Sequence, residues 1–274
     1  MIIDGHSHAI GTFADITSLK KLMKELAVDK IVLCPGGGAP DSKHIVPKYK
    51  ENFFTTRHRL VMLSNRMLRG NYQSHSDRDL GNFYVRSLVE QLPDKLLQFY
   101  WINFLDKEYK EKLTKANKDW KLSGLKLHQC VVPFTNDSED MKFIATFAAK
   151  NNLPIFIHIF SPKEARKLAE LARSNPKTNF IVAHMMGFED ILKVGKDLTN
   201  VYFDISTYYI ISRKRIKKAI KYFGSDHVFL GSDSPLGIDN LKNNILKIRD
   251  MDLSEEDRNN ILGLSFAKLL GLLK

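Results

Sequence analysis

Histidine is the residue type whose placement most strongly suggests chemistry in this chain. Of its nine histidines, His6 and His8 are separated by a single residue near the N-terminus. Residues two apart in an extended segment point to the same side, so both imidazoles could bind one metal ion. A His-x-His pair also occurs by chance in loops. The pair therefore indicates a metal site only if other donors join it.

Three further polar residues each close an apolar run. His158 follows the run 154–157, His184 follows the run 180–183, and Asp233 closes the run that begins at Val228. Such runs predict buried strands, and parallel α/β folds build their active sites where the strands end. Each residue alone could instead cap the next helix, most of all Asp233, because Asp is a preferred N-cap. Together with His6 and His8 they favour a site for zinc or a similar divalent ion.

The elements that must position these residues alternate along the chain. Short runs rich in Ile, Val, Phe and Tyr predict eight strands, at 1–4, 30–34, 97–103, 123–127, 155–158, 180–183, 201–205 and 228–230. Stretches with apolar residues at helical spacing lie between them, and Ser161-Pro162 and Ser254 predict helix starts. Without a compositional break, these units predict one (β/α)8 TIM barrel over residues 1–274, with a doubly wound open sheet as the alternative.

One connection is longer than the others. From Pro35 to Asp79 the sequence contains no clear strand, and connections this long are usually functional or locally disordered. Because it follows the second strand, we expect it to cover the C-terminal mouth of the barrel as a lid. Its arginines could clamp a substrate carboxylate or phosphate, with Arg57 and Arg59 as the candidate substrate-binding residues. A solvated surface loop is the alternative.

Composition limits the class of protein. The chain carries 42 Lys and Arg against 31 Asp and Glu, a net charge of +11, but these basic residues are spread out and form no nucleic-acid-binding motif. No apolar run is long enough to cross a membrane, the N-terminus does not resemble a signal peptide, and two cysteines are too few for a disulfide scaffold. We expect a cytoplasmic protein that binds a small molecule and neither nucleic acid nor membrane, with a homodimer left open.

Five short motifs occur in a known order. They are IDGHSH at 3–8, GLKLH at 124–128, PIFIH at 154–158, AHMMG at 183–187 and LGSDSP at 230–235. In these motifs the chain resembles the amidohydrolase superfamily, in particular the amidohydrolase-related branch that contains aminocarboxymuconate-semialdehyde decarboxylase-like proteins. Residues 261–263 and 267–272 are similar to the closing helix of the family, although Phe266 replaces its usual Asn. The motifs indicate the superfamily and not a particular reaction.

The resemblance implies roles for the candidate residues. One divalent ion, expected to be zinc, would be held by His6, His8, His158 and Asp233. Asp233 and His184 would be catalytic, with His184 as a polarising group or, alternatively, a ligand of a second ion. His128, at the end of the fourth strand, is the candidate substrate contact; alternatively it supports another site residue or is a satisfied polar residue at the strand end. In two-metal members of the superfamily a lysine of the fourth strand is carboxylated and bridges the ions, and Lys126 could do so here.

The expected function is hydrolysis of a small, anionic lactone, cyclic amide or ester-like substrate by a metal-activated water. The alternative is a metal-dependent non-oxidative decarboxylase of the same branch. In such lyases Glu commonly stands two residues before the first His, whereas this chain has Asp4 there, which disfavours that alternative. Asp204 and Ser206 end the seventh strand, and either could contact the substrate. A non-enzymatic basic barrel would leave the converging histidines unexplained.

Overall fold

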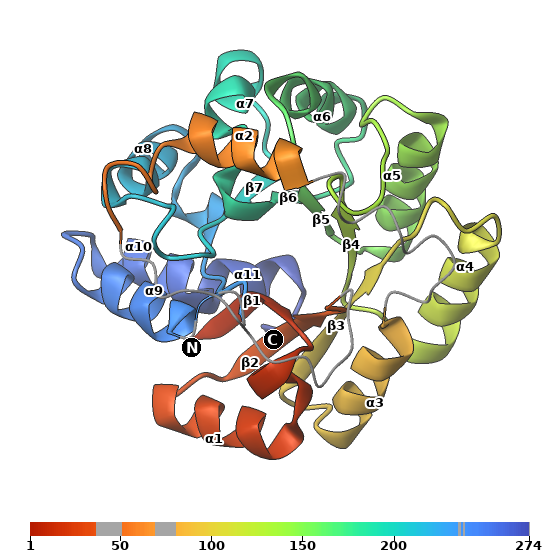
Figure 1. The fold of residues 1–274 in the computed structure, drawn as a ribbon, viewed down its shortest axis with the longest axis horizontal. Coiled ribbons are helices and arrows are strands. Elements are labelled where there is room, and N and C mark those ends of the chain that lie inside the picture. The colour runs from red at the N-terminus through yellow and green to blue at the C-terminus, as the bar shows by residue number, and fades with distance from the viewer. Residues whose placement is uncertain (37–50, 69–80, 235–236, 238, 274) are drawn as a thin grey trace.

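Eight parallel strands form the centre of the computed structural model, which describes residues 1–36, 51–68, 81–234, 237 and 239–273 (Figure 1). The strands are β1 Ile3–His8, β2 Lys30–Cys34, β3 Leu96–Trp101, β4 Gly124–His128, β5 Ile155–His158, β6 Phe180–Val182, β7 Val201–Asp204 and β8 Val228–Phe229. Each strand pairs with the next one in the sequence, in the order β1 to β8. The predicted strands are therefore confirmed, with ends that differ by a few residues.

The sheet closes where β1 meets the residues that follow β8. Backbone hydrogen bonds join the Gly5 N–H to the Leu230 carbonyl at 3.0 Å and the His8 N–H to the Ser234 carbonyl at 2.7 Å. The buried Asp4 carboxylate accepts hydrogen bonds from the Ser232 amide (2.9 Å) and from its hydroxyl (2.6 Å). An open sheet has no such closure, so the (β/α)8 barrel is confirmed and the open-sheet alternative is wrong.

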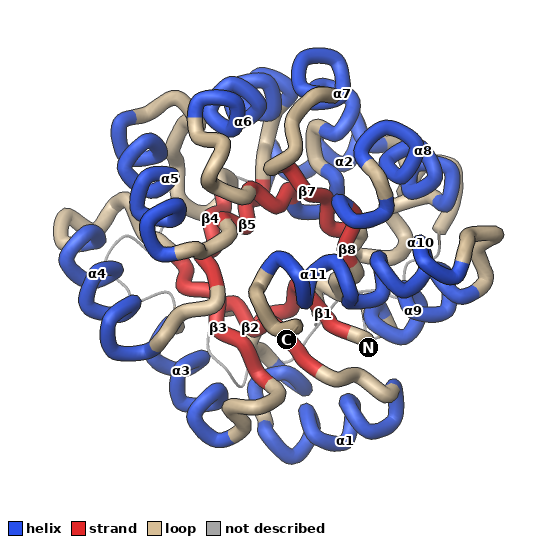
Figure 2. The backbone as a smooth tube through the Cα atoms, turned by 180° about the vertical axis from the view of Figure 1, so that it is seen from behind, coloured by secondary structure: helices blue, strands red, loops and turns tan. Residues whose placement is uncertain are grey.

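Most of the helices surround the barrel (Figure 2). The α-helices are α1 Ile16–Leu26, α2 His58–Leu68, α3 Asn82–Gln91, α4 Tyr109–Trp120, α5 Glu139–Asn151, α6 Pro162–Ser174, α7 Phe188–Gly195, α8 Arg213–Phe223, α9 Asn240–Arg249, α10 Glu255–Asn259 and α11 Ser265–Leu269. Both predicted helix starts are confirmed, because Ser161 and Ser254 each accept a hydrogen bond from the backbone three residues on. None of the helices in the described part of the chain has the length and apolar character that a membrane span requires.

Large apolar side chains fill the interior of the barrel. Phe99, Phe156, Phe229 and Phe266 belong to one buried cluster there, and each such ring stabilises the fold by about 1.5–3 kcal/mol when it leaves water. Gly124 provides the space for Phe99, because a Cβ at this position would overlap the ring. Since the lower part of the barrel is packed with side chains, the mouth remains as the place for a site.

The long connection after β2 contributes a helix to this mouth. Within it, the structure describes residues 51–68, and α2 crosses the ends of β6 and β7 in Figure 1. His58 Nε2 accepts a hydrogen bond from the Gly187 amide at 2.9 Å, and Glu51 pairs with Lys247 at 2.9 Å. Residues 51–68 lie over the mouth, as expected for a lid. The helix within them is not predicted from the sequence. Residues 37–50 and 69–80 of the connection are outside the described residues.

Candidate metal centre

Polar residues from both ends of the chain meet at the C-terminal mouth of the barrel. The ligand atoms of His6, His8 and Asp233 lie within 4.8 Å of one another. Asp233 Oδ1 is 3.6 Å from His6 Nε2 and 3.4 Å from His8 Nε2, and Asp233 Oδ2 is 3.7 Å from His184 Nε2. The predicted convergence of these four residues is therefore present in the structure. We call them the histidine–aspartate cluster.

Asp233 and His184 do not cap the helices that follow them. The N-cap of α7 is Gly187 and that of α9 is Asp239, so the capping interpretation of Asp233 is wrong. Instead, the backbone is left-handed at both residues, with φ of 51° at His184 and 55° at Asp233. Non-glycine residues seldom adopt this conformation, and such strain is concentrated at functional sites. The strain supports a role for both side chains in the chemistry of the mouth.

Hydrogen bonds around His8 leave one lone pair of its ring for a metal ion. His8 Nδ1 faces the carbonyl oxygen of Pro35 at 2.7 Å. A carbonyl oxygen only accepts hydrogen bonds, so Nδ1 carries the proton. Nε2 faces Asp233 Oδ1 at 3.4 Å. A carboxylate oxygen only accepts, so a cation must lie between the two atoms whenever Nε2 carries a lone pair, and these donors fit a divalent ion.

Burial and nearby charges set the protonation states of this cluster. Burial, followed by the charge of Lys126, lowers the pKa of His6 well below its usual value. Burial alone would raise the pKa of Asp233, but the surrounding histidines, with His184 foremost, outweigh burial and hold that pKa well below its usual value. Neutral imidazole and ionised carboxylate are the states in which these groups bind a metal.

Lys126 of β4 lies inside the barrel next to the predicted ligands. Its side chain is fully buried, and its Nζ lies 2.8 Å from His6 Nε2 and 4.4 Å from the centre of the Phe156 ring. The ammonium group donates to the same lone pair that a metal ion would use. Metal binding at His6 therefore requires the Lys126 ammonium group to move aside. The alternative role of Lys126 as a carboxylated bridge stays a prediction.

His158 and His128 stack face to face at the ends of neighbouring strands. Their ring centres are 3.9 Å apart with an angle of 7° between the planes, and Trp101 stacks on His128 at 5.9 Å. Imidazole lone pairs lie in the plane of the ring, so two parallel stacked rings cannot both ligate one ion. This argues against a second metal site at His128, Cys130 and His158, although their donor atoms are within 4.8 Å of one another.

His158, which is also a predicted ligand, lies next to His184 at the edge of the histidine–aspartate cluster. The two rings meet edge to face, with their centres 5.2 Å apart. Among the described residues, His158 Nδ1 is buried without a hydrogen-bond partner, and burial lowers the pKa of His158 well below its usual value. A neutral ring with an unpartnered nitrogen can serve as a further ligand. This role and the substrate contact of His128 stay predictions.

The two arginines predicted to bind substrate lie at the start of the lid helix. Arg57 and Arg59 are both exposed, and the Arg57 guanidinium group packs over the Phe53 ring at 4.0 Å. Within the described part of the chain, no hydrogen bond or ion pair joins either arginine to the histidine–aspartate cluster. A role in clamping an anionic substrate stays a prediction for both residues.

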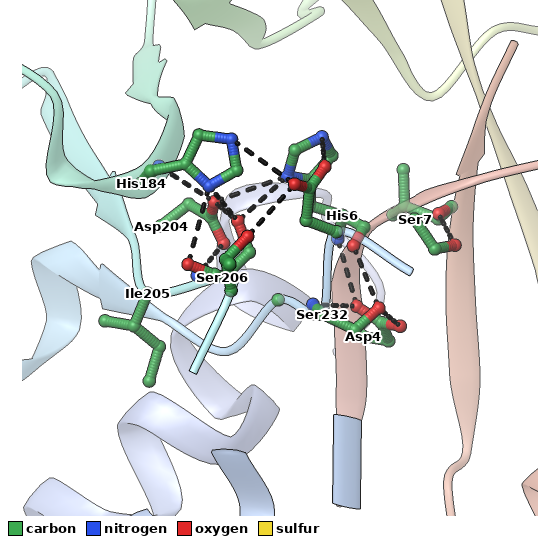
Figure 3. A network of polar contacts seen from close by, with 12 residues as sticks. Asp4, His6, Ser7, His184, Asp204, Ile205, Ser206 and Ser232 are labelled. Atoms are coloured by element: carbon green, nitrogen blue, oxygen red, sulfur yellow. Dashed lines mark hydrogen bonds and ion pairs between the residues drawn. The ribbon is translucent and has the colours of Figure 1, made fainter. Parts of the chain in front are cut away.

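A polar network below the cluster contains Asp204 and Ser206, the two residues at the end of the seventh strand that were expected as candidate substrate contacts (Figure 3). The Asp204 carboxylate accepts hydrogen bonds from the amides of Ser206 (3.0 Å) and His184 (3.1 Å). Ser206 Oγ contacts the same carboxylate. Gly231 makes this arrangement possible, because a Cβ at its position would overlap Asp204 Oδ1. The signal in the sequence was two polar residues on one side of a strand end, in the pattern Asp-x-Ser.

Comparisons with known proteins agree with the fold that carries this site. The model of the amidohydrolase family matches residues 69–272. Among solved structures, 2,6-dihydroxybenzoate decarboxylase from Rhizobium superimposes with a TM-score of 0.68 at 14% sequence identity, covering 99% of this chain and 98% of that chain. No curated protein sequence gives a significant match.

Two further solved structures contain bound ligands, and one of them is named for a different reaction. A dihydroxybenzoic acid decarboxylase from Polaromonas sp. JS666, with bound manganese and 2-nitroresorcinol, has a TM-score of 0.67 at 15% identity, with coverage of 99% and 97%. A probable 2-pyrone-4,6-dicarboxylic acid hydrolase from Acinetobacter baumannii, with citric acid bound, has a TM-score of 0.64 at 14% identity, with coverage of 98% and 99%. At these identities the likeness shows the shared fold and leaves the reaction open.

Proposed function

This chain belongs to the amidohydrolase family, and from that premise we propose that it is a metal-dependent hydrolase of a small, anionic lactone, cyclic amide or ester-like substrate. The residues that would hold one divalent ion are His6, His8, His158 and Asp233. Such an ion lowers the pKa of a bound water toward about 7 and polarises the carbonyl group under attack. Enzymes of this family carry out their chemistry with a divalent metal, and the neutral imidazoles and the carboxylate of this mouth suit that requirement.

The observation that supports this proposal most is the difference between the surroundings of the two carboxylate oxygens of Asp233. Oδ1 faces the two metal-binding nitrogens of His6 and His8 at 3.6 and 3.4 Å. Oδ2 accepts a hydrogen bond from the Thr207 hydroxyl at 3.0 Å and faces His184 Nε2 at 3.7 Å. One oxygen is thus directed at the donors for the ion, while the other can exchange a proton with an imidazole. The proposed hydrolysis uses both functions of this one carboxylate.

The proton path in this proposal uses two side chains. Asp233 takes the proton of the attacking water and passes it to the leaving group. His184, when it receives a proton on Nε2, offers that N–H to the oxyanion that develops on the substrate carbonyl. The Thr207 hydroxyl holds the carboxylate so that Oδ2 stays next to His184.

Zinc is the proposed metal, because three imidazoles and one carboxylate are a common zinc donor set. Manganese is the second metal to test, since the Polaromonas decarboxylase contains it. Activity should therefore be measured after loading the chelator-treated protein with each of the two ions separately.

A decarboxylase is the alternative function, because two of the structures compared above carry that name. The position of Asp4 favours hydrolysis instead. The Asp4 carboxylate is fully buried and binds the amide of His6 (3.2 Å) together with the amide and hydroxyl of Ser232. It is therefore occupied in closing the barrel and does not take part in the metal cluster. Release of CO2 without consumption of water would support the decarboxylase.

Replacement of Asp233 by Asn tests the hydrolase directly. We expect Asp233→Asn to lower turnover by about 10²–10⁴-fold, because Asn cannot accept the water proton, while its amide oxygen retains most of the metal. Acid release from a panel of lactones, cyclic amides and esters measures turnover, and elemental analysis measures the metal. Asp252→Asn, which changes an exposed carboxylate, is the matched control. Full activity of the Asp233→Asn variant would exclude this mechanism.

A further inference from the structure

The hydroxyl group of Ser206 lies between the two histidines that face Asp233. Ser206 is fully buried, and its Oγ is 2.8 Å from His184 Nδ1 and 3.1 Å from His6 Nδ1. The third neighbour of this oxygen is the carboxylate of Asp204. Figure 3 shows Ser206 within this network, together with Asp204, His184 and His6.

The positions of the protons follow from counting donors. The Ser206 hydroxyl has one proton, and the Asp204 carboxylate, which already receives two backbone N–H groups, can only accept it while it is ionised. The remaining lone pairs of Oγ then accept from the two imidazoles. Both His6 and His184 must therefore carry a proton on Nδ1.

Two weaker neighbours support the same assignment. His6 Nδ1 lies 3.4 Å from Asp204 Oδ2, and His184 Nδ1 lies 3.4 Å from the backbone carbonyl of Ser206. Both neighbouring oxygens only accept hydrogen bonds. Each ring therefore has acceptors alone around Nδ1. The lone pair of Nε2 is at the face where Asp233 lies, where in His6 it accepts from Lys126.

We propose that Ser206 is a positioning residue that fixes the tautomer and orientation of His6 and His184 together, through one hydroxyl group shared between a metal ligand and a proton-transfer residue. The metal and proton-transfer roles in this statement rest on the function proposed above. A group that is hydrogen-bonded to the second nitrogen of a ligand histidine raises the basicity of the ring and holds its orientation. Loss of such a group lowers metal affinity by about 10–100-fold.

The inference is tested on the protein freed of metal with a chelator and labelled with [15N]histidine. Long-range 1H–15N spectra report which ring nitrogen carries the proton, and His6→Gln and His184→Gln variants assign the signals. In the wild type we expect both rings to carry a proton on Nδ1. In Ser206→Ala we expect loss of these Nδ1–H signals or a mixture of tautomers, together with about 10–100-fold weaker zinc binding in a competition titration.

Two variants separate positioning from general loss of structure. Ser206→Thr keeps the hydroxyl group and should restore the spectra and the zinc affinity. Ser265→Ala removes a buried hydroxyl group that has no hydrogen-bond partner among the described residues, and both readouts should stay as in the wild type. A ring without a proton on Nδ1 in the wild type would overturn the proposal, as would unchanged spectra and affinity in Ser206→Ala. If neither zinc nor manganese binds the wild type, the proposed hydrolase fails, whereas the spectra of the metal-free protein still decide the role of Ser206.

Discussion

His8 is the proposed ligand whose removal most cleanly separates metal binding from barrel stability. Its Nδ1 is held by the Pro35 carbonyl, and its ring meets that of His6 edge to face with centres 5.0 Å apart. No strand hydrogen bond depends on its side chain in the described part of the structure. The ring therefore contributes mainly a donor atom to the mouth.

We expect His8→Ala to bind zinc more weakly than the wild type. The loss should exceed the roughly 10–100-fold that follows when a residue hydrogen-bonded to a ligand is removed. The reason is that the variant loses one of the donors that face Asp233. Elemental analysis of the purified protein measures this as a fall from about one ion per chain. His227→Ala is the control, since His227 binds the Val201 carbonyl and stacks on Tyr202 outside the cluster. Wild-type metal content in His8→Ala would contradict the assignment of His8.

At the scale of an element, the lid helix α2 is attached to the barrel by a titratable contact. His58 Nε2 accepts a hydrogen bond from the Gly187 amide and can do so only while it is unprotonated. Its side chain is 13% exposed. Burial first, and then the charges of Arg215 and Arg59, lowers the pKa of His58 from 6.5 to about 3. Glu189, 3.8 Å away, is the acidic group that faces it.

This contact predicts a pH-dependent lid. Because the folded pKa of His58 lies below the unfolded value, the undocked segment binds more protons between pH 6.5 and pH 3, and docking weakens as the pH falls through that window. Opening should become roughly tenfold more frequent per pH unit below 6.5. Hydrogen exchange of residues 58–68 measures it. His58→Gln, whose side-chain oxygen can accept the same hydrogen bond without titrating, should remove this dependence. If hydrogen exchange in His58→Gln depended on pH as it does in the wild type, this prediction would be refuted.

At the scale of the whole molecule, the contact between Asp4 and Ser232 closes the barrel between its first and last strands. Burial raises the pKa of Asp4 to about 7, so this carboxyl group is costly to leave without partners. The contact also lies two residues from His6 and next to Asp233. Closure of the fold and assembly of the site therefore depend on the same residues.

We expect Ser232→Ala to lower the free energy of unfolding by about 1–3 kcal/mol, because it leaves a buried carboxylate oxygen without its hydroxyl donor. Urea unfolding of the metal-free protein measures this change. Ser265→Ala is again the control, and its unfolding free energy should change by less than that of Ser232→Ala. Equal stability of the Ser232→Ala variant and the wild type would show that the contact does not stabilise closure.

The sequence by itself determined the strands and most of the site. Apolar runs ending in His158, His184 and Asp233 place polar groups at strand ends, and parallel strands bring their ends to one edge. Strand positions depend on the pattern of neighbouring residues, which the sequence contains. For this reason β2 and β5 were predicted with the bounds that the structure has. The membership of the amidohydrolase family followed from five motifs in order and was confirmed.

Only the tertiary structure decided how these groups share their protons. The stacking of His128 on His158, the Lys126 ammonium at His6, and the Ser206 hydroxyl between two imidazoles depend on atoms that meet through barrel closure. Their positions along the chain do not specify the rotamers or distances. The docking of α2 through His58 is likewise a contact between distant segments. Spacing along one strand fixes which face a side chain occupies, whereas hydrogen bonds across the barrel fix which atom it presents to a metal or a substrate.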